Sequence, residues 1–306
     1  MRLLKQIIII MGILSFFGCN SKTNKNEKVK EDSVQIITYS SLSNNVKDKL
    51  KNELEYDDKI EFNKEWVRTT DLQTDIINKY GFEGIKLIFE YRNSHNYYNI
   101  GSFPKDCPWN SLNDLSIQEC IEKNFDPLKN KLPLLIKALK ERCKFIYVEK
   151  KENTWHLHYF LEMKLHDNRS YHKVYTGGVP LLDPEPNKNL KAYNWNVPSD
   201  LELFYSIHNG FGEIYDAYFI MSNEDIKVMA EMMDPICKEQ NVTPEGYSFA
   251  DLLEFYPDGG GNAQCFLRVN GNTSSTVDWD HEVWEIQWEM GFFEFINERM
   301  SEIDEE

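Results

Sequence analysis

The last third of the chain contains strand-like segments joined by turns of the hairpin type. Leu252–Tyr256 and Ala263–Val269 are mainly apolar, and they are connected by Pro257–Asn262, which holds three consecutive glycines. The next connection is Asn270–Gly271, the dipeptide most typical of a two-residue hairpin turn. We expect Thr276–Asp280 to be the returning strand. These turns predict antiparallel strand pairs in this part of the chain.

Helices are predicted between and before these strands, so the fold class is α+β. A helix over Asp71–Tyr80 is expected to stop at Gly81, and another begins at Pro133. The remaining expected elements are strands at Ile85–Tyr91, Phe145–Lys150, Thr154–Lys164 and Ala217–Met221, with the second and third forming a hairpin, and helices after Ser222 with Asp225 and over Trp288–Met300.

The segment VPSDLELFYSIHNGFGE, residues 197–213, has the marks of a helix with both ends specified. Pro198 suits the first turn, and Ser199 with Glu202 three residues later fits a capping box. Leu201, Phe204, Tyr205 and His208 share one apolar face. Gly210 stands where a left-handed helix cap is expected.

The N-terminus resembles the signal of a bacterial lipoprotein. Arg2 and Lys5 precede the apolar run Ile7–Phe17, which is too short for a permanent membrane span. Gly18 stands directly before Cys19, although Phe16 occupies the place where a lipobox usually has leucine. The resemblance implies cleavage after residue 18, acylation of Cys19 and a lipid anchor in the cell envelope, with the outer membrane as destination. The alternative is an ordinary cleaved signal with an incidental cysteine.

Composition divides the remainder. Residues 19–33 are polar and predict a flexible tether. The Gly/Pro-rich passage 176–192 predicts a linker between an unassigned α+β domain, 34–175, and a C-terminal domain, 193–306. The five other cysteines form no CxxC pair, so we expect buried thiols rather than a zinc or redox site.

Charge is distributed unevenly along the chain. The formal net charge is −16, which argues against binding to nucleic acid. Residues 193–306 contain 24 acidic residues and four basic ones, a balance of −20, whereas the rest carries 26 acidic and 30 basic residues, or +4. A concentrated negative field accelerates association with a basic partner.

Four carboxylates are the candidate partner-binding residues. Asp278, Asp280 and Glu282 alternate, so on a strand they would share one face, and Asp258 lies in the preceding glycine-rich turn. A divalent cation and a plain solvated surface are the alternatives. No cofactor or metal is expected. Gly259–Gly261 has no helix after it and no lysine near it, which favours a turn over a phosphate-binding loop.

Histidines supply the other candidates. His156 and His158 would face the same way on a strand, and a metal site there would need His166 or His172. His281 lies beside Asp280, as a general base would, but no nucleophile stands at a recognisable spacing. For all of these histidines, a structural role in the core or on the surface is a simpler expectation than metal binding or catalysis.

Several motifs, taken in order, resemble the SUKH superfamily, which includes bacterial immunity proteins and a fungal regulator of cell-wall synthesis. The resemblance covers about 193–300 and rests on Val197, Pro198, Asp200, Leu201, Phe204 and Tyr205, then Asn209–Gly210, the glycine-rich turn after Phe255, Trp279–His281 and the final helix with Phe293 and Phe295.

The resemblance implies a single α+β domain, with a mixed or antiparallel sheet flanked by helices, that binds a partner without catalysis. We therefore expect a lipid-anchored, non-enzymatic protein, an immunity-type antidote whose acidic face binds a basic toxin. The alternatives are an envelope-associated structural or regulatory module and a metal-dependent hydrolase built on residues 34–175.

Overall fold

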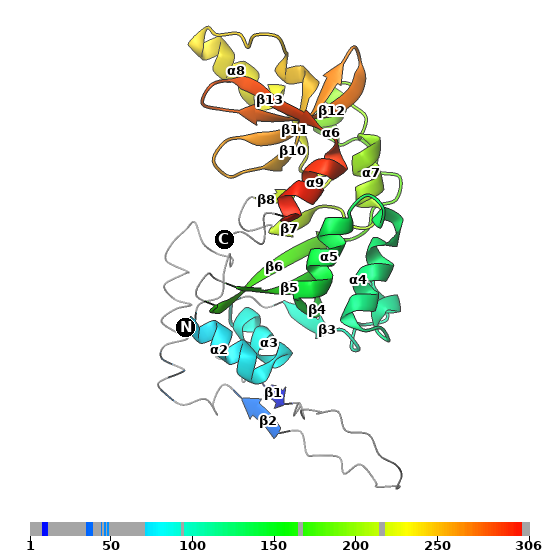
Figure 1. Ribbon diagram of the computed structural model, residues 1–306, viewed down its shortest axis with the longest axis vertical. Helices are drawn as coiled ribbons and strands as arrows, with labels where there is room; N and C mark the ends of the chain where they lie inside the picture. The colour runs from blue at the N-terminus through cyan, green and yellow to red at the C-terminus, as the bar shows by residue number, and fades with distance from the viewer. Residues whose placement is uncertain are drawn as a thin grey trace. The chain divides into compact units, whose positions relative to one another are not determined.

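The protein has an α+β fold, seen here in a computed structural model (Figure 1). The structure describes residues 8–11, 35–38, 44, 46, 48, 71–92, 95–164, 168–213 and 218–301. The chain divides into two compact units, one formed by residues 1–64 and 70–94 and the other by residues 65–69 and 95–306.

In the first unit, the described residues include helices α2 and α3 and one antiparallel strand pair. Helix α2 (Asp71–Tyr80) ends where predicted, at Gly81, whose φ of 59° is left-handed. Helix α3 (Phe82–Arg92) replaces the predicted strand Ile85–Tyr91, which is therefore wrong. Strands β1 (Ile8–Met11) and β2 (Gln35–Thr38) pair antiparallel.

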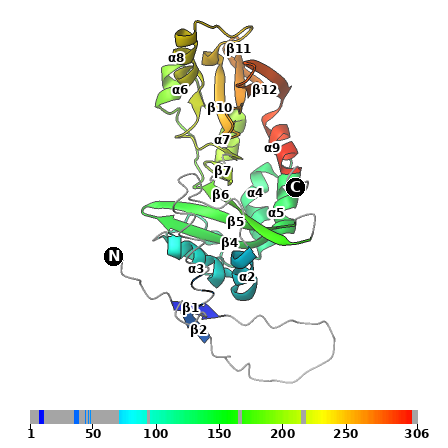
Figure 2. The ribbon, with the colours of Figure 1, turned by 90° about the vertical axis from the view of Figure 1, so that its left-hand side faces the viewer.

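The second unit begins with a six-stranded antiparallel sheet in the order β3-β4-β5-β6-β7-β8. The predicted hairpin is confirmed, with Lys151 opposite Thr154. Helices α4 and α5 pack against β4 and β5 (Figure 2). The strands are β3 (Asn96–Asn99), β4 (Cys143–Lys151), β5 (Thr154–Lys164), β6 (Ser170–Gly178), β7 (Phe211–Glu213) and β8 (Tyr218–Ile220).

A five-stranded antiparallel sheet in the order β13-β12-β11-β10-β9 follows. Asn270 and Gly271 have φ of 52° and 81°, as the predicted hairpin turn requires. Strand β13 occupies the start of the predicted helix Trp288–Met300, so that helix begins later than predicted. The strands are β9 (Lys227–Val228), β10 (Leu252–Pro257), β11 (Ala263–Val269), β12 (Asn272–Asp280) and β13 (Glu285–Met290).

The remaining helical elements of the second unit connect or cover these sheets. They are α4 (Ile117–Phe125), α5 (Pro133–Arg142), α6 (Lys188–Ala192), α7 (Ser199–Tyr205), α8 (Ala230–Gln240), α9 (Phe292–Ser301), and the 3-10 turns η2 (Asn110–Leu112), η3 (Asp126–Leu128) and η4 (Phe249–Asp251).

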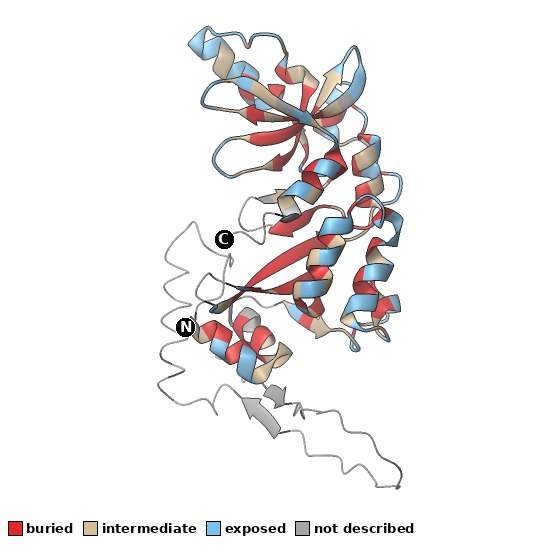
Figure 3. Ribbon diagram, in the orientation of Figure 1, coloured by how far each residue is buried: buried red, intermediate tan, exposed pale blue. Residues whose placement is uncertain are grey.

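One hydrophobic core extends through this unit. Buried residues lie along the strands of both sheets (Figure 3), and the core includes Tyr159, Phe211, Phe255 and Phe292. The predicted linker, 176–192, runs within the unit, because β6 pairs with β7 across it. The division into domains at 176–192 stays a prediction.

Helix α7 has the predicted buried face but not the predicted ends. Leu201, Phe204, Tyr205 and His208 are all buried. The capping box is absent: Pro198 is the N-cap and no side chain caps the helix. Gly210 has a φ of 83°, but it leads into β7 instead of capping the helix, which ends at Tyr205.

The segment after Ser222 also differs from the prediction. The hydroxyl of Ser222 donates to Asp225 across 2.6 Å, but a turn forms there instead of a helix. Helix α8 begins only at Ala230, because β9 comes first and pairs with β10.

A genuine capping box begins α4, and it provides a test. Ser116 accepts from the amide of Glu119 at 3.3 Å, while Glu119 accepts from the amide of Ser116 at 2.8 Å. Ser116→Ala is expected to lower the free energy of unfolding by about 1 kcal/mol. Ser199→Ala, the matched control, is expected to change it by less than about 0.5 kcal/mol. Equal losses in urea unfolding would contradict this assignment of the caps.

Candidate functional site

The candidate partner-binding residues gather at one end of the five-stranded sheet. Asp278 and Asp280 lie on the same face of β12. Val277 and Trp279 lie on the opposite face and are buried. Asp278 is half-buried and accepts from the amide of Gln264 at 2.7 Å on the neighbouring strand β11. The strand period therefore brings two of the predicted carboxylates together.

Asp258 lies in the turn between β10 and β11. Its Oδ1 accepts from the backbone amides of Gly260 at 2.7 Å and Gly261 at 2.9 Å, so the carboxylate fixes the glycine-rich turn. This is the turn that the sequence predicted. Asp258 is near enough to Asp278 for their charges to interact.

The pKa of one carboxyl group in this set, that of Asp278, is raised. Burial raises the pKa of Asp278, and the negative charges of Asp280 and Asp258 raise it further, while Arg299 of α9 and the bond from Gln264 lower it. Arg299 thus offsets part of the repulsion between these carboxylates, and a further cation bound there would relieve more of it.

Glu282 lies in the tight turn between β12 and β13 and is exposed. Asp280 holds this turn, because its Oδ1 accepts from the amides of Glu282 at 2.8 Å and Val283 at 3.4 Å. Glu285 stands opposite Asp280 in the strand register and adds a further acid that the sequence analysis did not select. We call Asp258, Asp278, Asp280 and Glu282 the acidic face.

A second polar group lies on the six-stranded sheet, around Glu149 of β4. His95 and Tyr97 both donate to its Oε1, the latter at 3.0 Å, and His158 of β5 donates to Oε2 at 3.2 Å. Nδ1 of His156 is 3.9 Å from the same Oε2. The predicted pairing of His156 with His158 on one strand is present, but Glu149 and His95 were not anticipated.

The pKa values around Glu149 do not suit acid–base catalysis at neutral pH. Burial favours the neutral acid, but the hydrogen bond and charge of His158, with bonds from His95 and Tyr97, lower the pKa of Glu149 to about 2. Burial and the charge of His158 lower the pKa of His156 to about 4. An efficient general base has a pKa near the working pH, so these groups are better suited to tying strands together.

Metal binding finds no support in the part of the chain that the structure describes. It contains no group of three His, Cys, Asp or Glu side chains placed to hold a metal. His172 packs against Phe160 on the sheet, with 4.8 Å between ring centroids. His166, the other predicted accessory ligand, lies outside the described residues.

His281 is held by the glycine-rich turn. Its backbone amide donates to Oδ1 of Asn262 at 2.9 Å, and its Nδ1 lies 2.8 Å from the same oxygen. Asn262 therefore orients the ring, and the predicted orientation by Asp280 is wrong.

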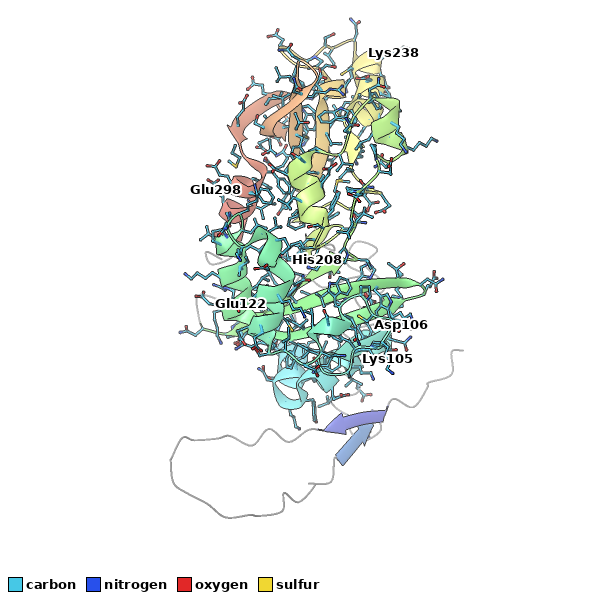
Figure 4. The ribbon with its side chains drawn as sticks, turned by 90° about the vertical axis from the view of Figure 1, so that its right-hand side faces the viewer. Lys105, Asp106, Glu122, His208, Lys238 and Glu298 are labelled. Atoms are coloured by element: carbon cyan, nitrogen blue, oxygen red, sulfur yellow. The ribbon has the colours of Figure 1, made fainter. Side chains whose placement is uncertain are left out.

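A buried histidine, His208, occupies the centre of the second unit (Figure 4). Its Nδ1 is 3.2 Å from the carbonyl of Gly178, which can only accept, so Nδ1 donates. Its Nε2 then accepts from the amide of Asn124 at 2.9 Å and lies 2.9 Å from the hydroxyl of Tyr159. Burial lowers its pKa to about 4, so His208 is a neutral structural residue.

The motif residues selected from the sequence serve the fold. Tyr205 donates to the carbonyl of Met221 at 2.8 Å, and the indole of Trp279 donates to Tyr247 at 3.0 Å. Phe204 and Pro198 are buried. Asn209 accepts from the amide of Asn223 at 2.7 Å, and Gly210 lies so near Ile220 that an added Cβ would be 3.2 Å from its carbonyl oxygen.

The five cysteines in the described part of the chain are free thiols, and four of them are buried. Burial raises the pKa of Cys120 to about 11 and that of Cys143 to about 12. A thiol becomes nucleophilic as the thiolate, so these two are packing residues, as predicted.

The predicted lipidation site, Cys19, and the tether after it lie outside the described residues. No described helix combines the length and hydropathy that a membrane span requires.

Comparison of the chain with protein-family models, with curated proteins and with solved structures finds no match.

Proposed function

We propose that the protein is a lipid-anchored, non-enzymatic binding protein whose acidic face contacts a basic protein partner, as an immunity-type antidote contacts a toxin. The observation that carries this proposal is the gathering of Asp258, Asp278 and Asp280 at one end of the sheet. The turn that contains Asp258 is joined there to β12, because Asn262 accepts from the amide of His281 at 2.9 Å, and Asp278 accepts from Gln264 of β11 at 2.7 Å. A basic partner would relieve the repulsion between these carboxylates on binding.

The cations of this part of the chain are too few to cancel the field. Residues 193–306 hold four basic side chains against 24 acidic ones. Arg299 interacts with Asp278 and offsets part of the repulsion there, while Lys227 pairs with Glu254 at 3.4 Å and Arg268 with Asp251 at 3.0 Å. Exposed ion pairs contribute only about 0–1 kcal/mol each to stability. The excess of acids is therefore better explained by long-range attraction of a partner than by folding.

The acidic face is also held in place before any partner arrives. Asp258 and Asp280 each accept two backbone amides of their own turns, and Asp278 accepts from Gln264. Groups that are already ordered lose less conformational entropy on association. A lipid anchor on Cys19, as the N-terminal sequence implies, would put the partner in the envelope or at the cell surface, where an exported antidote would act.

Binding of a fluorescent octalysine peptide tests this proposal. The full chain is compared with a variant in which Asp258, Asp278 and Asp280 become Asn and Glu282 becomes Gln. The variant lacks the four negative charges that attract the lysine side chains of the peptide. We therefore expect about tenfold weaker binding at low salt and a shallower dependence of the binding constant on salt concentration.

The matched control changes the net charge by the same amount elsewhere in the second unit. Glu202, Asp234, Glu239 and Glu245 are exposed, and replacing each by its amide is expected to weaken binding by less than about twofold. If the control variant loses as much affinity as the acidic-face variant, or if neither loses any, the proposed face is wrong.

A further inference from the structure

A polar cavity of about 590 Å³, open to solvent, lies beside α6, between that helix and the segment that leads into α8. Its three charged residues, Lys188, Glu224 and Glu231, are exposed. Its walls combine carboxylates, amides, one ammonium group and one phenol ring. Six of the residues that line it are Asn187, Lys188, Asn189, Tyr193, Glu224 and Glu231. None of them belongs to the acidic face.

The carboxylate of Glu224 is fixed by an asparagine from the motif after α7. The amide nitrogen of Asn209 donates to Oε2 of Glu224 at 2.8 Å. The amide oxygen of Asn209 accepts from the backbone of Asn223 at 2.7 Å, so both ends of that side chain are engaged. Among the described residues, none donates to the other carboxylate oxygen of Glu224, so that oxygen can accept from a ligand.

Glu231 is fixed in the same manner. The amide nitrogen of Asn189 donates to Oε2 of Glu231 at 2.6 Å, and its oxygen accepts from the backbone of Val228 at 2.7 Å. Asn187 ties the two walls together, because its amide donates to the carbonyls of Asn223 and Ile226, both at 2.8 Å. The two carboxylates are thus ordered before a ligand binds, which lowers the entropic cost of binding.

The charges of the lining select a cation. Glu224 and Glu231 are negative and Lys188 is positive, so the lining carries one net negative charge. Neither glutamate forms an ion pair with any residue that the structure describes. A ligand group with one positive charge would leave the lining neutral.

The size and the aromatic ring narrow the choice of cation. The cavity falls in the range of sites for organic ligands, about 300–1,000 Å³, and is far larger than a bare ion needs. A guanidinium group is planar, donates in several directions and stacks on aromatic rings such as that of Tyr193. Its donors point in fixed directions in one plane, so it can donate to two carboxylates at once. An ammonium group can also do so, but its donors rotate freely and fix no such geometry.

We propose that this cavity binds one guanidinium group, carried by an arginine side chain of a polypeptide or by a small molecule. The site is independent of the acidic face. Its acceptors are Glu224 and Glu231, and Tyr193 is the aromatic residue of the same lining.

The test is an NMR titration of the full chain with Nα-acetyl-arginine amide, with Nα-acetyl-citrulline amide as the uncharged control of nearly the same shape. We expect the arginine probe to shift backbone signals of 187–193 and 224–231 and to bind at least about tenfold more tightly than the citrulline probe. Agmatine and an acetylated Gly-Arg-Gly peptide, run in parallel, show whether a free small molecule or a peptide is the better ligand.

Glu224→Gln and Glu231→Gln should each lower the affinity for the arginine probe by about fivefold, since a glutamine still accepts from its asparagine partner but has no charge. Glu239→Gln, on the same helix as Glu231 but outside the lining, should change the affinity by less than about twofold. The acidic-face variant should bind the probe as the unchanged chain does, which separates this site from the proposed function. Equal binding of arginine and citrulline probes, or no effect of either lining variant, would overturn the proposal.

Discussion

Gly177→Ala is expected to lower the free energy of unfolding by about 3 kcal/mol, within the range seen when an overfilled core is forced to shift. A Cβ at Gly177 would lie 2.1 Å from Nδ1 of His208, far inside van der Waals contact. His208 cannot move aside, because it is buried, bonded at both ring nitrogens and stacked on Phe211 with 5.3 Å between centroids. Urea unfolding at neutral pH measures the loss.

Two controls make the result specific. Gly291→Ala meets nothing closer than 3.9 Å and should change stability by less than about 0.5 kcal/mol. Adding His208→Ala to Gly177→Ala removes the ring that the new methyl group meets. The loss of unfolding free energy in the double variant should therefore be smaller than the sum of the losses in the two single variants. A Gly177→Ala protein as stable as the original would show that His208 does not pack where the structure has it.

Acidification from pH 7 to pH 4 is expected to destabilise the protein by several kcal/mol. Burial lowers the pKa of His156, His172 and His208 to about 4, from an unperturbed 6.5. The folded state therefore keeps these imidazoles neutral while the unfolded chain takes up protons below pH 6.5. Since the unfolded state then binds more protons, stability is full above pH 6.5 and is lost as the pH falls towards 4.

Carboxylates extend this loss to lower pH. Glu149 has a pKa of about 2, so the stability that it contributes is present above pH 4.5 and is lost between pH 4.5 and 2. Urea unfolding at pH 7, 5.5 and 4.5 separates the histidine contribution from this one. His172→Gln removes one of the protons that the unfolded chain takes up, so it should reduce the slope of unfolding free energy against pH between pH 7 and 4.5 by the contribution of about one proton. A free energy of unfolding that does not change between pH 7 and 4.5 would contradict the burial of these rings.

Local signals were enough to predict the hairpins and several helices. The turn at Asn270–Gly271 needs positive φ at both residues, and Asn and Gly are the residues that adopt it most readily. Proline at the start of α5 and glycine after α2 marked helix ends that the structure confirms. In each case the residue at one position determines the backbone there, so no distant contact is needed.

The elements that were predicted wrongly depend on packing. Ile85–Tyr91 has the β-branched and aromatic residues of a strand, but it forms part of α3, with Ile85 and Ile88 buried three residues apart. Residues 288–290 were predicted as the start of the last helix, but they are the end of β13, whose pairing with β12 decides their conformation. Propensity is a weak guide where tertiary contacts compete with it.

The same reasoning applies to the candidate sites. The shared face of Asp278 and Asp280 follows from a period of two and could be predicted from the sequence. The group around Glu149 could not, because His95 lies 54 residues before Glu149 in the chain. The buried pair of Lys173 and Glu213, 3.2 Å apart, is separated by 40 residues and likewise depends on the register of the sheet.

The most direct test of the acidic face is zero-length cross-linking of octalysine to the full chain with a carbodiimide, followed by mass spectrometry. This chemistry joins a lysine amine only to a carboxylate that it touches. We expect the cross-links to concentrate on Asp258, Asp280 and Glu282 at physiological salt. Cross-links spread evenly over exposed acids such as Asp234 and Glu239 would contradict the proposal that this face binds the partner.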